Sequence, residues 1–286
     1  MKKLIPSVML TSLLFLAMPI LAQSNTSAPK ASEAATSGAS QYLKMNDQAR
    51  ASFISNYAGN LGWMLSPEKP LVVSAEGVQL IKKWVDVYAV RVGAADPKSG
   101  GEDLNKVFER AVQYAPIING EFEKEKVLET LGNAVALLES EFQPCPAKGK
   151  GKGMFAILPA SATSLGVKAD ALCDVEKGAN AAARFIKARM AEFGKDGISA
   201  ALAMLAYNRG TANVKRDFAE LIKEHDSGGE LWAILAKPDA KKFDKAFLDE
   251  GVHYLPRFFA AAILAESPET FGLKAYPLST YAPPKK

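Results

Sequence analysis

A carboxylate inside an apolar helical segment is the first candidate for chemistry. Glu139 lies within residues 136–142, near the end of a stretch whose apolar side chains repeat every three or four residues. Partial burial and the negative end of a helix both disfavour the anion, so they raise the pKa of this carboxyl. A general acid that works near neutral pH requires such a raised pKa. On spacing alone, a solvated surface carboxylate is the alternative interpretation.

The segment that carries Glu139 is predicted to be a helix over about residues 121–142. Its apolar positions follow helical spacing, and Pro144 and Pro146 would stop it. The glycine-rich residues 149–159 come next and are predicted to form a loop with a short extended run, where a small β-hairpin is possible. The sequence therefore places Glu139 near the end of a helix that leads into a loop.

Helical periodicity dominates the remainder of the chain. Further helices are predicted at about 78–88 with Ser74 as N-cap, 104–114, 175–193 with Gly194 as C-cap, 199–207, 214–222 and 255–264. No internal repeat and no alternation of strands with helices is visible, which disfavours a parallel-sheet nucleotide-binding protein. The predicted fold class is mainly α.

Three segments share a pattern with one enzyme family. Residues 139–142 read Glu-Ser-Glu-Phe, residues 153–159 read Gly-Met-Phe-Ala-Ile-Leu-Pro, and residues 205–210 read Leu-Ala-Tyr-Asn-Arg-Gly. They resemble the Glu-Ser-x-Phe, Gly-Leu-Trp-Gln-Ile-x-Pro and Ala-Ala-Tyr-Asn-x-Gly motifs of family 23 glycoside hydrolases, the lytic transglycosylases and goose-type lysozymes. Glu250 and residues 254–256 resemble a Glu-Thr-x-x-Tyr-Val-Pro pattern of the membrane-bound lytic transglycosylase D subgroup. The motifs occur in the family's order.

The resemblance implies a lysozyme-like catalytic domain over residues 119–274 that acts on peptidoglycan glycan strands. In that domain Glu139 would be the acid and base, and Ser140 would support the site. Tyr207 would lie against the carboxylate, and Asn208 would contact the sugar in the cleft. For Tyr207, a core aromatic with its hydroxyl at the surface is the alternative interpretation.

Other matched positions add substrate-binding candidates. Tyr254 would line the same groove, unless it is likewise a core aromatic, and Phe155 and Glu250 would also contact substrate. Phe155 stands where the family has Trp, and Ala156 stands where it has Gln, so an amide able to hydrogen-bond the glycan is missing. Because these departures fall where the glycan would lie, we hypothesise a preference for modified, N-deacetylated peptidoglycan.

The implied reaction is cleavage of the β-1,4 bond between N-acetylmuramic acid and N-acetylglucosamine by a single carboxylate. Goose-type relatives hydrolyse this bond instead, and a second carboxylate would then be useful. Glu250 and Asp170 are the candidates, because Glu141 would lie on the opposite helix face from Glu139. The same residues are also compatible with a non-catalytic glycan-binding protein on this scaffold or with a helical structural protein of the envelope.

Residues 148–152 alternate lysine with glycine. Cations on a flexible backbone could seat the carboxylates of peptidoglycan stem peptides. A solvated loop that charge keeps soluble would have the same composition. The run does not have the Gly-Lys-Ser/Thr ending of a phosphate-binding loop, and no predicted strand precedes it.

The beginning of the chain is typical of an exported protein. Residues 1–22 have the charged, apolar and small-residue parts of a signal peptide, and the small, polar residues 23–41 are predicted to be a flexible leader. Residues 42–118 are predicted as a helical extension ahead of the catalytic domain, and residues 275–286 as a tail. No later stretch is apolar enough for a stable membrane span. We therefore expect a monomeric protein, soluble after signal cleavage, that is periplasmic or secreted.

The cysteines, histidines and net charge limit the possible ligands. Cys145 and Cys173 are expected to form a disulfide, because export brings the chain into an oxidising compartment. His225 and His253 lie far along the chain without the spacing of metal ligands, so no metal and no cofactor are expected. The formal charge of +4 becomes 4 − 2 = +2 without the two lysines of the signal, which is too mild for nucleic acid.

Overall fold

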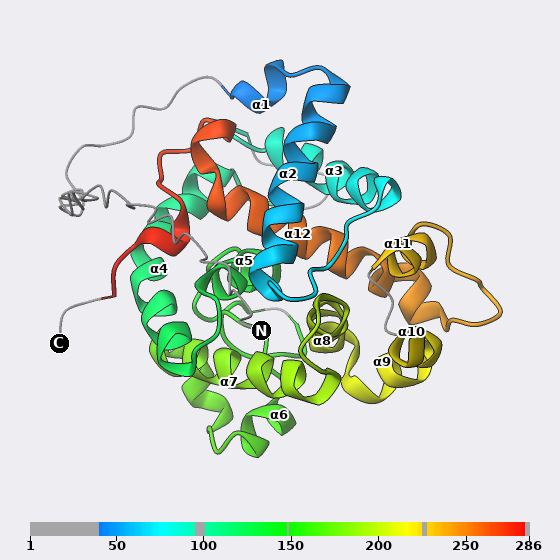
Figure 1. Ribbon diagram of the computed structural model, residues 1–286. Coiled ribbons are helices and arrows are strands. Elements are labelled where there is room, and N and C mark those ends of the chain that lie inside the picture. The colour runs from blue at the N-terminus through cyan, green and yellow to red at the C-terminus, as the bar shows by residue number, and fades with distance from the viewer. Residues whose placement is uncertain (1–39, 95–100, 148, 225–227, 284–286) are drawn as a thin grey trace, which may run out of the picture. The chain divides into compact units, whose positions relative to one another are not determined.

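The computed structural model describes residues 40–94, 101–147, 149–224 and 228–283. These residues belong to the second of two compact units, which comprises residues 35–286. Helices account for nearly all of the regular structure (Figure 1), so the prediction of a mainly α fold is confirmed. The α-helices are α1 (Gln41–Lys44), α2 (Asp47–Leu65), α3 (Ala75–Ala89), α4 (Leu104–Glu125), α5 (Glu129–Ser140), α6 (Pro159–Ser164), α7 (Val175–Phe193), α8 (Gly197–Arg209), α9 (Thr211–Asp217), α10 (Ala219–Glu224), α11 (Gly229–Ala236) and α12 (Val252–Glu266). The shorter elements are η1 (Ala169–Cys173), η2 (Phe247–Gly251), η3 (Pro268–Phe271) and η4 (Leu278–Thr280).

Local capping chemistry determines several helix ends. The hydroxyl of Ser74 accepts a hydrogen bond from the backbone N–H of Gly77 and so caps α3, as predicted. Helix α7 ends before Gly194, which has a positive φ, also as predicted. Asp196 caps the next helix, α8, through the N–H of Ser199. In these segments, the information that places the helix end is local.

The predicted helix over 121–142 is wrong, because two helices occupy this segment. Helix α4 continues to Glu125, and Lys126 then adopts a left-handed backbone conformation with φ of 58°. The turn allows α5 to fold back against α4. The contact is close: a Cβ atom added to Gly132 of α5 would lie 2.7 Å from the ring of Phe122 of α4. Tertiary packing therefore breaks a segment whose apolar periodicity looks continuous.

The possible β-hairpin at 149–159 is reduced to a single bridge. Lys152 donates its N–H to the carbonyl of Ile157 at 2.9 Å, and Ile157 donates back at 3.1 Å. No strand is present among the residues that the structure describes. The loop is thus closed by one reciprocal pair of backbone hydrogen bonds.

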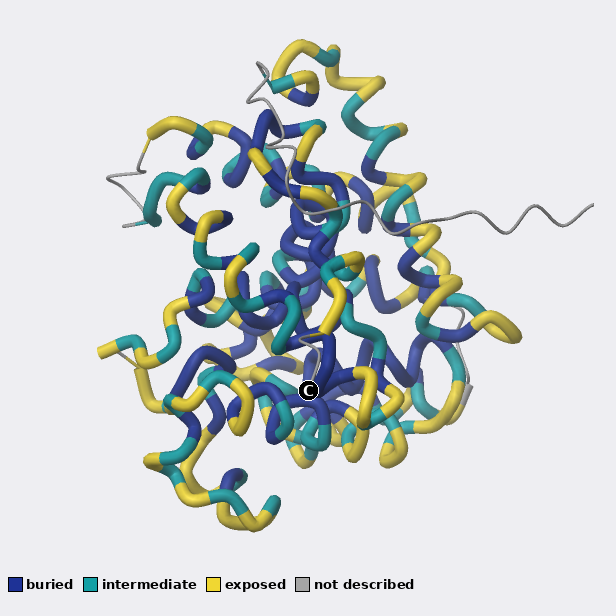
Figure 2. Tube along the Cα trace, turned by 90° about the vertical axis from the view of Figure 1, so that its left-hand side faces the viewer, coloured by how far each residue is buried: buried dark blue, intermediate teal, exposed yellow. Residues whose placement is uncertain are grey.

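Helix α12 lies in the hydrophobic core and contacts α3, α5 and α8. In Figure 1 it crosses the centre of the helical array, and Figure 2 shows the buried residues gathered in the interior. Helix α3 comes from the predicted N-terminal extension, so this segment shares a core with the predicted catalytic part. Helix α4 runs through the predicted boundary at residue 118. The domain division itself stays a prediction.

Trp63 and Trp84, both in the predicted helical extension, have different surroundings. Trp63 is 59% exposed and lies outside the core. Trp84 is partly buried, and its ring centroid lies 5.6 Å from that of His253 on α12. The fully buried tryptophan is Trp232 of α11, which donates its indole N–H to the carbonyl of Val72 at 3.1 Å.

The predicted disulfide is present. Cys145 and Cys173 are bonded, with their Cα atoms 4.9 Å apart. It joins the segment after α5 to the end of η1. The predicted signal peptide and nearly all of the predicted leader lie outside the described residues. Within the described part of the chain, none of the helices has both the length and the apolar character to span a membrane.

We expect Gly62→Ala to lower the free energy of unfolding by about 2 kcal/mol, because overpacking a close contact forces the backbone to shift. A Cβ atom at Gly62 of α2 would lie 2.4 Å from the carbonyl oxygen of Leu71. Gly59 of the same helix has no heavy atom within 4 Å of its Cβ position, so Gly59→Ala should stabilise by about 0.5 to 1 kcal/mol. Urea unfolding of both variants tests this, and shifts of equal sign would contradict it.

Candidate active site

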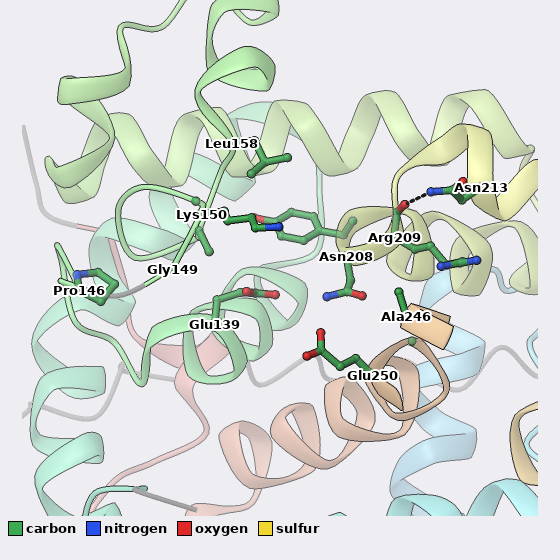
Figure 3. Close-up of a pocket in the computed structure, with 14 residues that line it drawn as sticks. Glu139, Pro146, Gly149, Lys150, Leu158, Asn208, Arg209, Asn213, Ala246 and Glu250 are labelled. Atoms are coloured by element: carbon green, nitrogen blue, oxygen red, sulfur yellow. Dashed lines mark hydrogen bonds between the residues drawn. The ribbon is translucent and has the colours of Figure 1, made fainter. Parts of the chain in front are cut away.

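Four segments that are distant in sequence meet around one pocket of about 640 Å³. This volume is typical of sites for small molecules or sugar units, roughly 300 to 1,000 Å³. The segments are the end of α5 with the following loop, the loop at 149–158, the junction of α8 and α9, and η2 with the residue before it (Figure 3). The lining residues are Glu139, Pro146, Gly149, Lys150, Gly151, Ala156, Leu158, Tyr207, Asn208, Arg209, Asn213, Ala246, Glu250 and Gly251.

Glu139 lies in the last turn of α5, partly buried, with its carboxyl directed into the pocket (Figure 3). The Tyr254 hydroxyl donates a hydrogen bond to its Oε1 at 2.8 Å. Burial raises the pKa of Glu139 above its ordinary value, and the bond from Tyr254 and the charge of Arg257 offset only part of that rise. The carboxyl therefore holds its proton at a higher pH than a solvated glutamate does.

The two candidate tyrosines make different hydrogen bonds at the site. Tyr254, on α12, is buried and hydrogen-bonds the Glu139 carboxyl. Tyr207 also lies near that carboxyl, because burial and the charge of Glu139 both raise the pKa of the Tyr207 hydroxyl. Tyr207 lines the pocket, and its hydroxyl donates to the carbonyl of Phe155 at 2.6 Å. Tyr254 is not among the lining residues. Tyr207 thus fastens the loop at 149–158 to α8, while Tyr254 contacts the carboxyl from the core.

Asn208 and Glu250 both line the pocket, as expected of substrate-contacting residues. Figure 3 shows Glu139 and Glu250 reaching toward the space beside Asn208 from different elements. Glu250 lies on η2, a single π-helical turn that leads into α12. Such turns occur often at functional sites. Asp170, the other candidate second carboxylate, is exposed on η1 and does not line this pocket.

Ser140 and Phe155 lie behind the pocket wall. The hydroxyl of Ser140 donates to the carbonyl of Ala136, one turn earlier in the same helix, at 3.2 Å. Phe155 is buried, with its ring 6.3 Å from that of Phe122. Neither side chain lines the pocket, so the structure does not bring these two predicted site residues to the place where substrate would lie.

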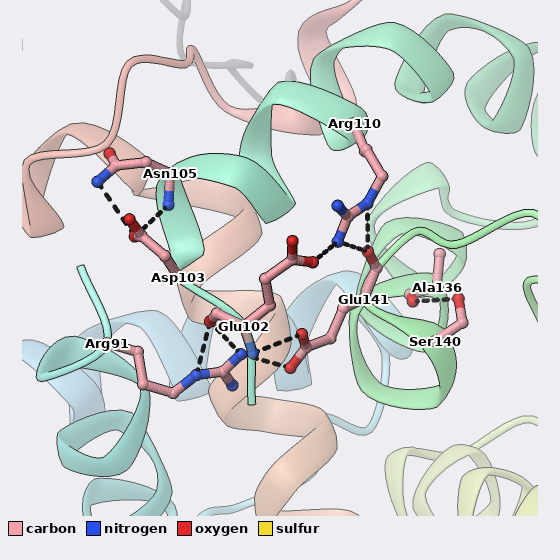
Figure 4. A network of polar contacts seen from close by, with 8 residues as sticks. All are labelled: Arg91, Glu102, Asp103, Asn105, Arg110, Ala136, Ser140 and Glu141. Atoms are coloured by element: carbon pink, nitrogen blue, oxygen red, sulfur yellow. Dashed lines mark hydrogen bonds and ion pairs between the residues drawn. The ribbon is translucent and has the colours of Figure 1, made fainter. Parts of the chain in front are cut away.

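A partly buried ionic network holds the end of α5 (Figure 4). Glu141 ends the helix in a left-handed conformation, with φ of 51°, and its carboxylate accepts from the Arg91 guanidinium at 2.5 Å. Arg91 is buried and also donates to the carbonyl of Glu102. Arg110 donates to the Glu141 carbonyl at 3.0 Å and so satisfies a backbone group that helix geometry leaves open. Glu141 is therefore a structural residue, two positions from Glu139.

Sequence reasoning did not identify two arginines that act at the site, Arg257 and Arg209. Arg257 stacks on Trp84 at 5.1 Å, and its charge lowers the pKa of Glu139. Arg257 follows Tyr254 by three residues, so helical spacing in the sequence would predict that both side chains lie on the same face of the helix. Arg209 lines the pocket and pairs with Asp217 at 2.6 Å and with Asp244 at 2.8 Å. Its guanidinium lowers the pKa of Asp244 to about 2.

The comparison with protein families decides the class of enzyme. Residues 116–227 match the family model of the transglycosylase SLT domain. The protein is accordingly a lytic transglycosylase, a lyase that acts on peptidoglycan, a substrate that lies outside the cytoplasm. No curated protein is similar enough to the chain to serve as a relative.

The matched domain contains part of the pocket. It includes Glu139, Tyr207 and Asn208, whereas Glu250 and Tyr254 lie beyond its end. Within the described residues of the transglycosylase, no group of His, Cys, Asp and Glu side chains could hold a metal ion.

Removal of Arg91 should destabilise the transglycosylase strongly. Arg91→Met leaves the Glu141 carboxylate, which is 22% exposed, without its buried partner. Breaking a fully buried ion pair costs about 3 to 5 kcal/mol, so we expect a loss near the lower end of this range. Lys245→Met is the matched control, because Lys245 pairs with Asp249 at an exposed position where its side chain is 87% exposed. In thermal unfolding, Arg91→Met should have a clearly lower Tm than Lys245→Met. Equal stability would show that the Arg91 network does not hold this part of the fold.

Replacement of Glu139 by Gln should stabilise the folded protein above about pH 5. Because the folded-state pKa is raised, the ionised carboxyl opposes folding, and this cost appears as the pH rises above the unfolded pKa. Glu139→Gln should therefore melt at a higher temperature than the parent at pH 7, and the difference should vanish at pH 3. Glu68→Gln, at an exposed site, is the control and should show no such dependence.

Proposed function

We propose that Glu139 is the single general acid and base of the transglycosylase. In this proposal it cleaves the β-1,4 bond between N-acetylmuramic acid and N-acetylglucosamine. The supporting observation is a carboxyl that faces the pocket, has a raised pKa and accepts a hydrogen bond from a buried tyrosine. A carboxyl in this state can donate a proton at neutral pH and can then be stabilised as an anion.

The reaction has two proton transfers. Protonated Glu139 first gives its proton to the glycosidic oxygen as the bond from that oxygen to C1 of muramic acid breaks, and the acetamido group of the sugar assists. The Glu139 carboxylate then takes the proton of the C6 hydroxyl while that oxygen bonds to C1 and closes a 1,6-anhydro ring. The Tyr254 hydrogen bond favours the anion between the two steps, because it stabilises the carboxylate form.

The other site residues divide into those that touch substrate and those that support the site. We assign sugar contacts to Asn208, Glu250 and Tyr207, because all three line the pocket. Ser140 and Phe155 support it from behind: the first lies within α5, and the second presents its backbone carbonyl to Tyr207.

Hydrolysis is the second candidate reaction, and the position of Glu250 favours it. Glu250 shares the pocket with Glu139, so its carboxylate could activate a water molecule that attacks C1 in place of the C6 hydroxyl. The same carboxylate supports the hypothesis of an N-deacetylated substrate, since a deacetylated sugar carries an ammonium group. Ala156 lines the pocket in place of the family's Gln and offers no amide to an acetyl group.

The four sequence motifs also support a proposal about the subgroup, the domain bounds and the location of the protein. We propose that it is a family 23 glycoside hydrolase of the membrane-bound lytic transglycosylase D type, with its catalytic domain at 119–274 behind a helical extension at 42–118. We also propose that residues 1–22 are a cleaved signal peptide and that the protein works as a monomer in the periplasm or as a secreted enzyme. The substrate supports this location, because peptidoglycan lies outside the cytoplasm.

Incubation of the purified protein with native and N-deacetylated sacculi, followed by mass spectrometry, tests the reaction. Glu139→Gln should lower product formation by at least about 100-fold, the lower end of what acid-base catalysis contributes. Anhydro-muropeptides would support the transglycosylase reaction. Reducing ends that disappear in Glu250→Gln would support hydrolysis, and equal attack on both sacculi would remove the basis for a deacetylated substrate. No cleavage of either substrate would overturn the enzymatic proposal.

Tyr254→Phe should move the high-pH limit of kcat to a higher pH. The Tyr254 hydrogen bond lowers the pKa of Glu139, so its removal raises that pKa and keeps the acid form protonated further into the alkaline range. The pH profile of kcat on isolated glycan strands measures the shift. Tyr114→Phe on α4 is the control and should leave the limit in place. A shift to lower pH would exclude this role for Tyr254.

A further inference from the structure

Lys150 lies in the wall of the pocket and has no bonded partner among the described residues. It comes from the lysine-glycine run, and Figure 3 shows its side chain extending from the loop into the pocket. The second lining cation, Arg209, is committed to Asp217 and Asp244. Among the described residues that line the pocket, Lys150 is therefore the one cation left to meet a ligand.

The backbone around Lys150 is held in place. Its neighbour Gly151 approaches Ala156 so closely that a Cβ atom there would lie 1.9 Å from the Ala156 carbonyl oxygen. The bridge from Lys152 to Ile157 closes the loop one residue later. These contacts fix the backbone that follows Lys150, while its exposed side chain stays free to meet a ligand.

Charge is distributed unevenly within the pocket. Glu139 and Glu250 supply the carboxyl groups, and Lys150 supplies a positive charge from a separate loop. A neutral stretch of glycan can accept hydrogen bonds from that cation but cannot neutralise its charge. An ammonium group offers three hydrogen-bond donors and no acceptor, so the ligand that suits it is an anion.

We propose that Lys150 binds a carboxylate of the peptidoglycan strand, which makes it a specificity residue of this pocket. The inference rests on the proposed function, because it assumes that the glycan occupies the pocket beside Glu139. Two carboxylates have the required chemistry. One is the lactyl carboxylate of muramic acid, which is free where the stem peptide has been removed, and the other belongs to the stem peptide itself.

Binding measured in the inactive Glu139→Gln background separates this inference from the catalytic proposal, since it does not depend on turnover. The probes are soluble glycan strands that carry stem peptides, the same strands stripped of peptide, and chitin oligosaccharides, which have no carboxylate. Lys150→Met should weaken binding by about fivefold at low salt, the effect of about 1 kcal/mol from a partly solvated ion pair. Lys150→Arg should retain most of the affinity.

The pattern across the probes identifies the carboxylate. A loss confined to stripped strands assigns the lactyl group, and a loss confined to peptide-bearing strands assigns the peptide. Equal affinity of Lys150→Met and its parent for all three probes, or an equal loss on chitin oligosaccharides, would overturn the proposal. Lys177→Met, an exposed lysine of α7 outside this pocket, is the matched control and should bind as its parent does. Cleavage by the unsubstituted protein tests the catalytic proposal independently.

Discussion

The ion pair between Arg91 and Glu141 ties the end of α5 to the chain before α4, and the geometry of the site depends on it. A helix end normally leaves carbonyl groups unpaired and is free to fray. Here Arg110 donates a hydrogen bond to the backbone carbonyl of Glu141 at the end of α5, and Arg91 forms an ion pair with the Glu141 carboxylate. Glu139 lies about half a helical turn before Glu141, so its carboxyl has a defined position relative to Tyr254.

The site also carries a cost that the rest of the fold has to offset. A partly buried carboxyl without an ion-pair partner opposes folding when it ionises, yet this same burial gives it the proton affinity that an acid catalyst needs. Helix α12 supplies the only compensation seen among the described residues, through the hydroxyl of Tyr254 and the charge of Arg257. Because α12 is buried among α3, α5 and α8, these two groups are presented by rigid structure.

Much of the fold could be predicted from the sequence where local chemistry decides the outcome. The cap at Ser74 and the stop at Gly194 are such cases, because a side-chain acceptor and a positive φ act within one turn. The break at Lys126 could not be predicted in this way. The apolar spacing continues through it, and the turn is favoured only because α5 can then pack on α4. Trp63 is a similar case, since periodicity does not reveal which side of a helix finds a partner.

The sequence by itself indicated that Glu139 is the candidate acid, that its pKa is raised and that Cys145 pairs with Cys173, and its motifs resemble those of lytic transglycosylases. The raised pKa follows from position in a helix and the pairing from residue type in an exported chain, whereas the motifs carry information only through the resemblance. Only the tertiary structure decided that Tyr254 rather than Tyr207 holds the carboxyl, and that Glu250 rather than Asp170 shares its pocket. The physical reason is that a hydrogen bond or a shared cavity depends on how distant helices pack, and spacing within one helix carries no information about that.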